Sequence, residues 1–303
     1  MRPRSLAVSA RTLGLTVSHE QDGRRVRSLL QGPLGLSAGL VTRLKQRPGA
    51  VRLNGQAVRT LDVAHAGDRL EVDVGDTREG VFVPGGPALD ILYEDEDLLI
   101  INKPAGIAVH GRSERGEPTI GAAVARYLGS AAPFHPVNRL DRGTTGAMCA
   151  AKNGYMHDRL RKILHTDAFR REYLAVACGE MPERAGVIDL PIARVPGEKR
   201  FHTAPEGLAS VTRYEVLGSA GGLSLLRLRP ETGRTHQIRV HLAALGCPIA
   251  GDRLYGGGTL AARPLLHSAA LYLVHPLTGA AVSVTAPMPE DMQEVLRAHE
   301  IVL

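Results

Sequence analysis

Residues 137–146 place one carboxylate between two basic side chains. Asp141 follows Arg139 by two positions and directly precedes Arg142, and two glycines complete the segment. Nearby positive charge favours an ionised carboxylate and attracts an anionic polymer. Because glycine adopts backbone angles that other residues avoid, we expect a tight loop here. Two interpretations follow: Asp141 is a nucleophile presented to a nucleic acid, or the segment is a surface turn closed by an Arg–Asp salt bridge.

The composition of the 303-residue chain is that of a globular protein, with 44% hydrophobic residues. This length exceeds what one core normally serves, so we expect two domains. No apolar run reaches the roughly 18 residues of a membrane helix, and Arg11 interrupts the start of the chain, so we expect no membrane anchor and no signal peptide. Cys149, Cys178 and Cys247 lack metal-ligand spacing. We expect free thiols, no metal site and a reducing, cytoplasmic location.

The positive charge of the chain is concentrated near its N-terminus. Residues 1–80 hold 13 Lys and Arg against 8 Asp and Glu, a balance of +5, whereas the other 223 residues hold 24 against 23, a balance of +1. A basic module ahead of a nearly neutral body indicates an anchor for a polyanion. The alternative is an ordinary basic surface in contact with water.

Residues 13–74 have the pattern of two helices and a small sheet. Hydrophobic spacing predicts one helix over 26–30 and a second over 37–44, whose first residue is a suitable N-cap serine. Asn54-Gly55 is a strong hairpin signal, and residues 70–74 alternate like a strand. The polar side of the helices is expected to carry Arg24, Arg25, Arg27, Arg43, Lys45 and Arg47.

Two basic helices followed by a hairpin resemble the small RNA-binding domain named after a ribosomal small-subunit protein, the S-four type. Residues 50–53 and the Asn54-Gly55 turn carry this resemblance. We therefore divide the chain into a leader at 1–12, an RNA-binding domain at 13–74, a linker rich in Gly, Pro and charge at 75–88, and a second domain at 89–303.

The second domain is expected to mix strands with amphipathic helices. Apolar runs predict strands at 90–93, 98–102, 148–152, 172–177, 211–217 and 223–228. Helices are predicted over 119–128, over the face of Met156, Leu160, Ile163 and Leu164, and over the face of Ile238, Leu242 and Leu245, which Gly246 ends.

Three sequence motifs in this domain occur together, in this order, in one known family. They are residues 101–106 with Val109-His110-Gly111, residues 138–141 with Gly143 and Thr145-Gly146, and residues 231–242 followed by Gly251-Asp252 and Tyr255-Gly256. Over residues 89–289 the chain resembles the RluA-type pseudouridine synthases, which modify uridines in ribosomal and some transfer RNA. The resemblance implies an α+β fold, with a mixed, largely antiparallel central sheet and flanking helices, beside a small α/β RNA-binding domain.

The resemblance also implies a reaction and the residues that perform it. We expect a monomer that isomerises specific uridines to pseudouridine without a cofactor, in ribosomal RNA or, as the alternative, in transfer RNA. Asp141 corresponds to the catalytic aspartate, Tyr173 to the active-site tyrosine, and Arg239 to the arginine that pairs with the aspartate. The expected RNA-binding residues are Arg139, which holds or replaces the flipped nucleotide, together with Arg142, Arg234, His236, Arg24, Arg43 and Lys45.

Several of these residues also have a simpler interpretation. Tyr173 on a strand would otherwise be a core aromatic, and Arg239 on an amphipathic helix would otherwise be a solvated charge. His236 and His241 lie five residues apart, which does not match a zinc-binding helix. We expect these histidines to orient backbone or RNA.

The sequence departs from the family pattern in two places. The residue before Arg139 is usually histidine and here is Asn138, and the residue before Gly146 is usually serine and here is Thr145. Asparagine forms hydrogen bonds but carries no charge, so the sequence leaves the role of this position open. The nucleophile, the tyrosine and the arginine are all present, and we expect activity.

Uridine isomerisation breaks the bond from base nitrogen to sugar, turns the base and rejoins it through carbon five. No atoms are gained, so no cofactor is needed. The base must first leave its stack, at a cost of roughly a few kcal/mol. In the family the aspartate acts covalently at the sugar or at base carbon six, or the reaction passes through a glycal. The sequence does not choose between these routes, in which Tyr173 would stack on the uracil near the departing proton.

Other functions fit the same residues less well. A non-catalytic RNA-binding protein has no need for Asp141, Tyr173 and Arg239 together. An RNA methyltransferase needs a strand followed by a Gly-rich cofactor loop, and a phosphate-transfer enzyme needs a Gly-Lys-Ser/Thr loop. Neither loop occurs in the sequence. The mass of the RNA product separates isomerisation, which leaves it unchanged, from methylation, which adds to it.

Overall fold

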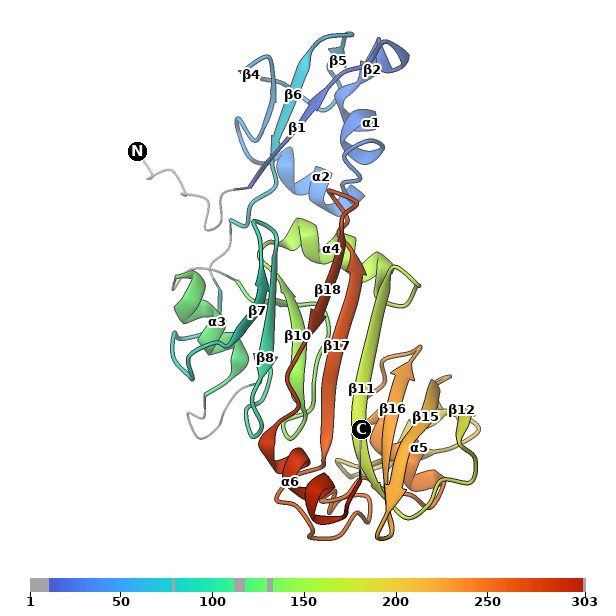
Figure 1. Ribbon diagram of the computed structural model, residues 1–303. Coiled ribbons are helices and arrows are strands. Elements are labelled where there is room, and N and C mark those ends of the chain that lie inside the picture. The colour runs from blue at the N-terminus through green and yellow to red at the C-terminus, as the bar shows by residue number, and fades with distance from the viewer. Residues whose placement is uncertain (1–10, 78–79, 112–117, 130–132, 302–303) are drawn as a thin grey trace.

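The computed structural model describes residues 11–77, 80–111, 118–129 and 133–301. The chain forms a small N-terminal unit and a larger body, arranged end to end (Figure 1). The predicted leader falls mainly on residues 1–10, outside the described residues. Within the described ranges, no helix is long and apolar enough to cross a membrane, and no cluster of His, Cys, Asp and Glu is suited to a metal ion.

A four-stranded antiparallel sheet and two short helices build the N-terminal unit. The strands follow one another across the sheet in the order β1 (Thr12–Thr16), β6 (Arg69–Asp73), β3 (Val51–Leu53) and β4 (Gln56–Ala57), and β2 (Arg24–Arg25) pairs separately with β5 (Val63–Ala64). The helices are α1 (Val26–Gln31) and α2 (Ala38–Leu44). The predicted hairpin is confirmed, because Asn54 and Gly55 have φ angles of 50° and 80°, as a type I′ turn requires. Ser37 caps α2 through a hydrogen bond from the Leu40 amide.

Two local expectations about this unit were wrong. Arg24 and Arg25 belong to strand β2 and not to a helix, because Arg24 pairs with Ala64 and α1 begins only after Arg25. Arg47 lies beyond the end of α2, where it forms a salt bridge with Asp73 at 2.7 Å. Strand β1 was not predicted, since its five residues hold only two large apolar side chains.

A ten-stranded sheet forms the centre of the body. Its strand order is β12-β15-β16-β11-β17-β10-β8-β7, with β18 paired to β17 and β9 paired to β10. All pairs of described strands are antiparallel except β10 and β17, which run parallel where residues 145–146 lie opposite 267–268. The expected mixed, largely antiparallel sheet is therefore confirmed. The strands are β7 (Ile91–Glu94), β8 (Leu98–Lys103), β9 (His135–Pro136), β10 (Thr145–Ala151), β11 (Phe169–Cys178), β12 (Ala185–Asp189), β15 (Val211–Ala220), β16 (Leu223–Pro230), β17 (Leu266–Val274) and β18 (Ala281–Thr285).

Four helices and one extra hairpin surround this sheet in the described part of the body. They are α3 (Ile120–Leu128), α4 (Gly154–Ile163), α5 (Gln237–Ala244), α6 (Glu290–Ala298) and the hairpin of β13 (Ile192–Arg194) with β14 (Phe201–Thr203). The three predicted helices are confirmed as α3, α4 and α5. Figure 1 shows α3 beside β7 and β8, and α5 beside β15 and β16. Strands β17 and β18 and helix α6 were not predicted, although β17 occupies the middle of the sheet.

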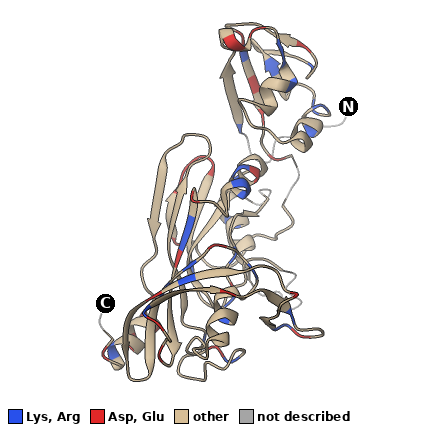
Figure 2. Cartoon of the chain, turned by 90° about the vertical axis from the view of Figure 1, so that its right-hand side faces the viewer, with Lys and Arg blue, Asp and Glu red and all other residues tan. Residues whose placement is uncertain are grey.

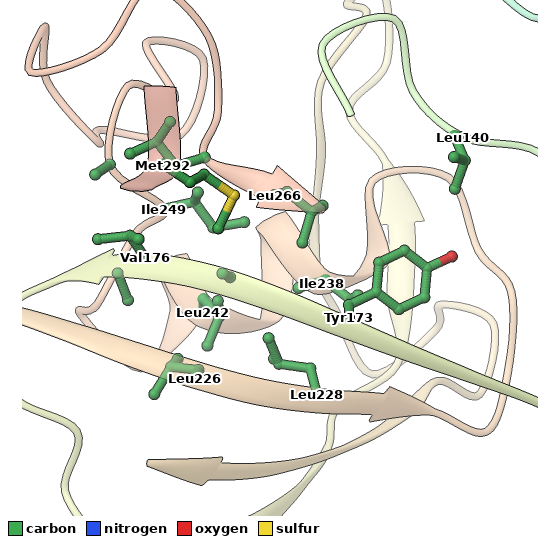
Figure 3. Close-up of a cluster of buried hydrophobic side chains, with 14 of the residues drawn as sticks. Leu140, Tyr173, Val176, Leu226, Leu228, Ile238, Leu242, Ile249, Leu266 and Met292 are labelled. Atoms are coloured by element: carbon green, nitrogen blue, oxygen red, sulfur yellow. The ribbon is translucent and has the colours of Figure 1, made fainter. Parts of the chain in front are cut away.

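An apolar cluster supports the strands that carry the candidate site. It joins Val176 of β11, Leu226 of β16, Leu242 of α5 and Met292 of α6 (Figure 3). Tyr173 stands at one end of this cluster, and its hydroxyl points away from Leu242 (Figure 3). The cluster therefore fixes β11 and α5 relative to one another, and these two elements carry Tyr173 and Arg239.

Helix α4 holds the N-terminal unit against the body. Tyr155 is 3% exposed and packs into the apolar cluster of the N-terminal unit, and its hydroxyl donates to the Leu34 carbonyl at 2.6 Å. Arg11 donates to both oxygens of Asp97 at 2.9 and 2.8 Å. A Cβ at Gly35 would lie 1.8 Å from a guanidinium nitrogen of α4. Side-chain contacts, and not only the connecting segment, thus join the two units.

Candidate active site

A cavity of about 560 Å³ opens in the body between loops that come from distant parts of the chain. Its walls are the loop before β10, the start of β11, one side of α4 and the segment that leads into α5. Lys and Arg positions occur both on the N-terminal unit and across the middle of the body (Figure 2). Among the described residues that line the cavity, Asp141 is the one carboxylate.

Asp141 faces an arginine whose orientation is fixed from behind. Arg239 donates to the two oxygens of Asp252 at 2.6 and 2.8 Å, and from Nη1 to Oδ2 of Asp141 at 3.3 Å. Burial alone would lower the pKa of Arg239, but the hydrogen bonds and charge of Asp252, with the charge of Asp141, outweigh it and raise the pKa. One permanent cation is therefore shared between two carboxylates, and the bidentate pair sets its direction.

Tyr173 provides an apolar wall of the cavity. Its side chain is 6% exposed and packs with Leu140, Leu228 and Ile238 (Figure 3). Burial raises the pKa of its hydroxyl, which also interacts with Ser268. The hydroxyl therefore stays protonated at neutral pH. Tyr173 is therefore a core aromatic that also lines the cavity, because its ring belongs to the apolar cluster and borders the cavity.

His236 connects Asp141 to a second tyrosine. Its Nε2 lies 3.9 Å from Oδ2 of Asp141, and its Nδ1 lies 2.9 Å from the hydroxyl of Tyr255. That hydroxyl accepts the backbone N–H of Phe201 at 3.0 Å. Burial lowers the pKa of His236, which favours the neutral ring. A proton on Nε2 faces the carboxylate favourably, and Nδ1 then accepts the proton of the Tyr255 hydroxyl.

The Asp141 loop is fastened by a buried lysine. Lys103 is fully buried, and its ammonium donates to the carbonyl oxygens of Pro104 and Ile107 at 2.8 Å and of Arg142 at 3.2 Å. The Gly106 amide donates to the same Arg142 carbonyl at 2.9 Å. Burial lowers the pKa of Lys103 to about 8. These bonds tie the turn after β8 to the residue that follows Asp141.

Directly after this loop, the second residue of β10 is a glycine that no other residue could replace without a shift of the backbone. Gly146 has a φ of 104°, and a Cβ there would lie 2.2 Å from the carbonyl oxygen of Ser268. Thr145 contacts the neighbouring strand through its hydroxyl, 2.9 Å from Nδ1 of His267. The parallel pairing of β10 with β17 thus holds the end of the Asp141 loop.

Comparison with known proteins agrees with this geometry. A model of the RNA pseudouridylate synthase family matches residues 97–244. A Bacillus subtilis protein named as the uncharacterized RNA pseudouridine synthase YhcT is 36% identical over 296 residues, covering 95% of this chain and 98% of that protein. The chain belongs to the RNA pseudouridine synthase family.

Further relatives of this pseudouridine synthase support the assignment. Ribosomal large subunit pseudouridine synthase D of Escherichia coli is 39% identical over 250 residues, covering 76% of each chain. The solved structure of human RNA pseudouridylate synthase domain containing 4 is 28% identical, with a TM-score of 0.59 over 71% of this chain and 94% of that chain. The predicted fold and the predicted class of enzyme, an isomerase that acts on RNA, are confirmed.

The basic residues predicted to bind RNA fall into two groups in this pseudouridine synthase. Arg139, Arg142, Arg234 and His236 line the cavity. Arg139 is exposed, and its Nη1 lies 3.4 Å from Nε2 of His110. The second group, on the N-terminal unit, is exposed and does not line the cavity: Arg24, Arg43 and Lys45.

Asn138 and His241 form hydrogen bonds inside the protein. Asn138 is buried, and its side-chain oxygen accepts the Cys149 amide at 2.7 Å, whereas its Nδ2 has no partner among the described residues. His241 is buried and contacts Thr212 and the Leu190 carbonyl, so it orients backbone as expected.

Three residues around Asp141 were not assigned a role from the sequence. Asp252, Tyr255 and Lys103 each lie in a sequence motif that marks the family. Membership of that motif was the signal by which the sequence could have identified them. Asp252 lies 13 positions from its partner Arg239, and Tyr255 lies 19 positions from His236. Lys103 lies 39 positions from the Arg142 carbonyl that it contacts. Spacing along the chain gives no indication of these contacts.

Proposed function

We propose that Asp141 is the nucleophile of this pseudouridine synthase and that Arg239 and Tyr173 are its catalytic partners. The observation that carries the proposal is the hydrogen bond from Arg239 to Asp141 in the cavity, with Arg239 held by Asp252. The guanidinium keeps its proton, so it offers the attacking carboxylate a fixed positive charge and a hydrogen bond. Asp252 is 1% exposed, which leaves Asp141 as the carboxylate that substrate can reach.

In the proposed reaction the bond between uracil N1 and sugar C1′ breaks, the uracil turns, and C5 bonds to C1′. The proton on C5 leaves and N1 gains one, so the atoms balance without a cofactor. Asp141 attacks the sugar, attacks C6 of the base, or assists a route through a glycal. All three routes require an ionised Asp141, which the charge-assisted hydrogen bond from Arg239 stabilises.

Tyr173 is proposed to stack on the uracil and to take part in moving the C5 proton. Its ring lines the cavity within an apolar cluster, which provides a flat surface for the turning base. Its raised pKa leaves a protonated hydroxyl that can donate a hydrogen bond. Stacking holds the detached uracil inside the cavity between the two bond changes.

Contacts outside the reaction centre are proposed to open and hold the RNA. Arg139 is exposed beside the cavity and would fill the gap that the flipped uridine leaves. Arg142, Arg234 and His236 line the same cavity and would contact the RNA near the target. Residues 13–74 would act as an S-four-type RNA-binding domain that grips phosphates through Arg24, Arg43 and Lys45.

Ribosomal RNA is the proposed substrate, and transfer RNA is the alternative. A relative at 39% identity is named as a ribosomal large subunit enzyme. The proposed site of action is the cytoplasm, where ribosomal RNA is available and where three free thiols would remain reduced. We propose that one chain carries a complete site, since Asp141, Tyr173 and Arg239 all come from the same chain.

The test is pseudouridine mapping by carbodiimide-dependent reverse-transcription stops. Ribosomal and transfer RNA would be taken from cells that carry the wild-type protein, Asp141→Asn or no protein. We expect specific stops in the wild type that vanish with Asp141→Asn, because an amide is a far weaker nucleophile than a carboxylate. Stops that persist with Asp141→Asn would overturn the assigned nucleophile.

The position of the lost stops identifies the substrate at the same time. Stops in ribosomal RNA support the proposal, whereas stops confined to transfer RNA replace it with the alternative. Thermal denaturation of purified Asp141→Asn provides the control, since the variant must fold before lost activity can be assigned to chemistry. Asp167→Asn, an exposed aspartate outside this cavity, is the matched variant and should leave every stop in place.

A further inference from the structure

Arg171 is a buried cation in the cavity that the proposed chemistry does not use. It lies on β11, is 8% exposed, and donates from Nη2 to the carbonyl oxygens of Pro230 and Thr232 at 3.3 Å. Its Nε is buried without a partner in the described part of the chain, and none of the ion pairs found there includes Arg171. Because a guanidinium keeps its proton, a full charge is buried without a counter-ion.

The other arginines of an adjoining cavity have side-chain partners. A second cavity of about 600 Å³ shares Arg171 with the first. Among its other arginines, Arg213 and Arg229 form salt bridges with glutamates, and Arg170 lies over a tyrosine ring at 5.6 Å. Arg171 is thus the unmatched cation at the junction of the two cavities.

The cavity reaches the Arg171 side chain beside Gly233 and His165. A Cβ at Gly233 would lie 3.3 Å from Nη1 of Arg171 and 3.3 Å from Cε1 of His165. The φ angle of Gly233 is not left-handed, so the backbone does not require glycine there. A side chain at this position would instead press against the guanidinium and the imidazole on the cavity side. Arg161 and Arg234 line the same cavity and add positive charge.

We propose that the part of the cavity lined by Arg171 binds a phosphate of the RNA, on the nucleotide next to the target uridine. A phosphate oxygen matches the planar donors of Arg171 in geometry and in charge. Arg171 and Tyr173 are two positions apart on one strand, so their side chains lie on the same face, about 6.6 Å apart. A uracil stacked on Tyr173 therefore places an adjoining phosphate at Arg171. This inference rests on the proposed function, which takes RNA as the occupant of the cavity.

The first experiment uses the wild-type protein and a modified RNA. A short fluorescein-labelled hairpin with one uridine in its loop would carry a neutral methylphosphonate at each loop linkage in turn. We expect one linkage beside the uridine to weaken binding about tenfold, as the loss of one charge-assisted hydrogen bond would. Equal affinity for every modified hairpin would overturn the phosphate site.

The second experiment assigns that linkage to Arg171. With Arg171→Gln, affinity for the unmodified hairpin should fall about tenfold, and the slope of log affinity against log salt should fall by about one. The sensitive linkage should then tolerate the methylphosphonate. Arg170→Gln removes the same charge from the neighbouring exposed position and should change affinity less than about twofold. A linkage effect that survives in Arg171→Gln would overturn the assignment.

A third variant keeps the proposal testable if Arg171→Gln fails to fold. Gly233→Ala keeps every charge and presses a methyl group against Arg171 on the cavity side, so it should also abolish the linkage effect. Retained linkage sensitivity in folded Gly233→Ala would contradict the proposal. Fluorescence anisotropy measures all of these affinities, and its signal does not depend on turnover. A failed phosphate site therefore leaves the Asp141 mapping result intact, and a failed mapping result leaves the binding measurement valid.

Discussion

The two ends of the active-site cavity hold buried positive charge in opposite ways. At one end Arg239 is bound by Asp252 and Asp141. At the other end Arg171 forms hydrogen bonds only with backbone carbonyl oxygens within the described structure, although both arginine residues are equally buried, at 8% exposure. The described residues therefore supply carboxylate partners at the first end and none at the second.

This difference separates a group that must be ready from a group that must be completed. A nucleophile gains from a partner that is already oriented, because no rearrangement is then needed during the reaction. A binding group gains from an unmatched charge, because the substrate then supplies the missing interaction. The cost of burying Arg171 without an anion lowers the stability of the free protein and is recovered when a phosphate binds.

The largest expected effect comes from removing the matched cation. Arg239→Met leaves the buried Asp252 carboxylate without a partner, so the free energy of unfolding should fall by about 3–5 kcal/mol. Arg171→Met should change it by less than about 1 kcal/mol, because an apolar side chain often replaces a buried charge without loss. Urea denaturation of both variants measures the contrast. Equal losses in the two variants would remove the distinction between the two ends.

A smaller effect concerns Lys103, whose charge is matched by carbonyl oxygens alone. Its pKa of about 8 in the folded protein is below the ordinary value of 10.5, so the unfolded chain binds more protons between these values and stability rises with pH. From pH 7 to 9.5, wild type should gain about 2 kcal/mol of stability relative to Lys103→Met. Urea denaturation at both pH values checks this. A constant difference would show that carbonyl oxygens match the charge as fully as carboxylates do.

A third prediction refines the description of the matched end. Tyr255→Phe removes the hydroxyl that contacts His236, so the ring would no longer be held with Nε2 toward Asp141. We expect kcat to fall about tenfold, corresponding to one lost hydrogen bond, with KM unchanged. Steady-state kinetics on the mapped substrate measure both values. Tyr272→Phe, which does not line this cavity, should change neither, and a change only in KM for Tyr255→Phe would assign that residue to binding.

The smallest effect is expected far from both ends. Arg43 is exposed on α2, where water already solvates its charge. Arg43→Gln should weaken RNA binding about twofold to threefold at physiological salt and lower the salt slope by about one. Fluorescence anisotropy across a salt series gives both quantities. Unchanged binding would show that this helix face does not contact RNA, and a tenfold loss would rank it with the cavity arginines.

Much of the fold was predictable because local rules act over short distances. The hairpin at Asn54-Gly55 and the cap of α2 at Ser37 each depend on a few adjacent residues. Strand β17 was not predictable in the same way, since its sequence has His267 and Ser268 near its start and lacks a regular alternation. Its place in the centre of the sheet depends on pairing with β10 and β11.

Asp141 and Arg239 were named from sequence motifs that mark the family, whereas their arrangement required the fold. No local rule connects Asp141 with Arg239, which are 98 positions apart. Arg171 was visible in the sequence beside Tyr173, but its lack of an anion is a property of everything packed around it. Absence of a partner is therefore harder to predict than presence of a motif.

Helix α4 sets the spacing between the N-terminal unit and the cavity. It presents Tyr155 to the N-terminal unit and presents His157 and Arg161 to the cavity. Its ten residues span about 15 Å, so under the proposed function α4 sets how far the RNA-binding surface of the N-terminal unit lies from the reaction centre. One residue inserted between these two sets would rotate them about 100° relative to one another. The N-terminal unit would then be turned away from its present position relative to the cavity.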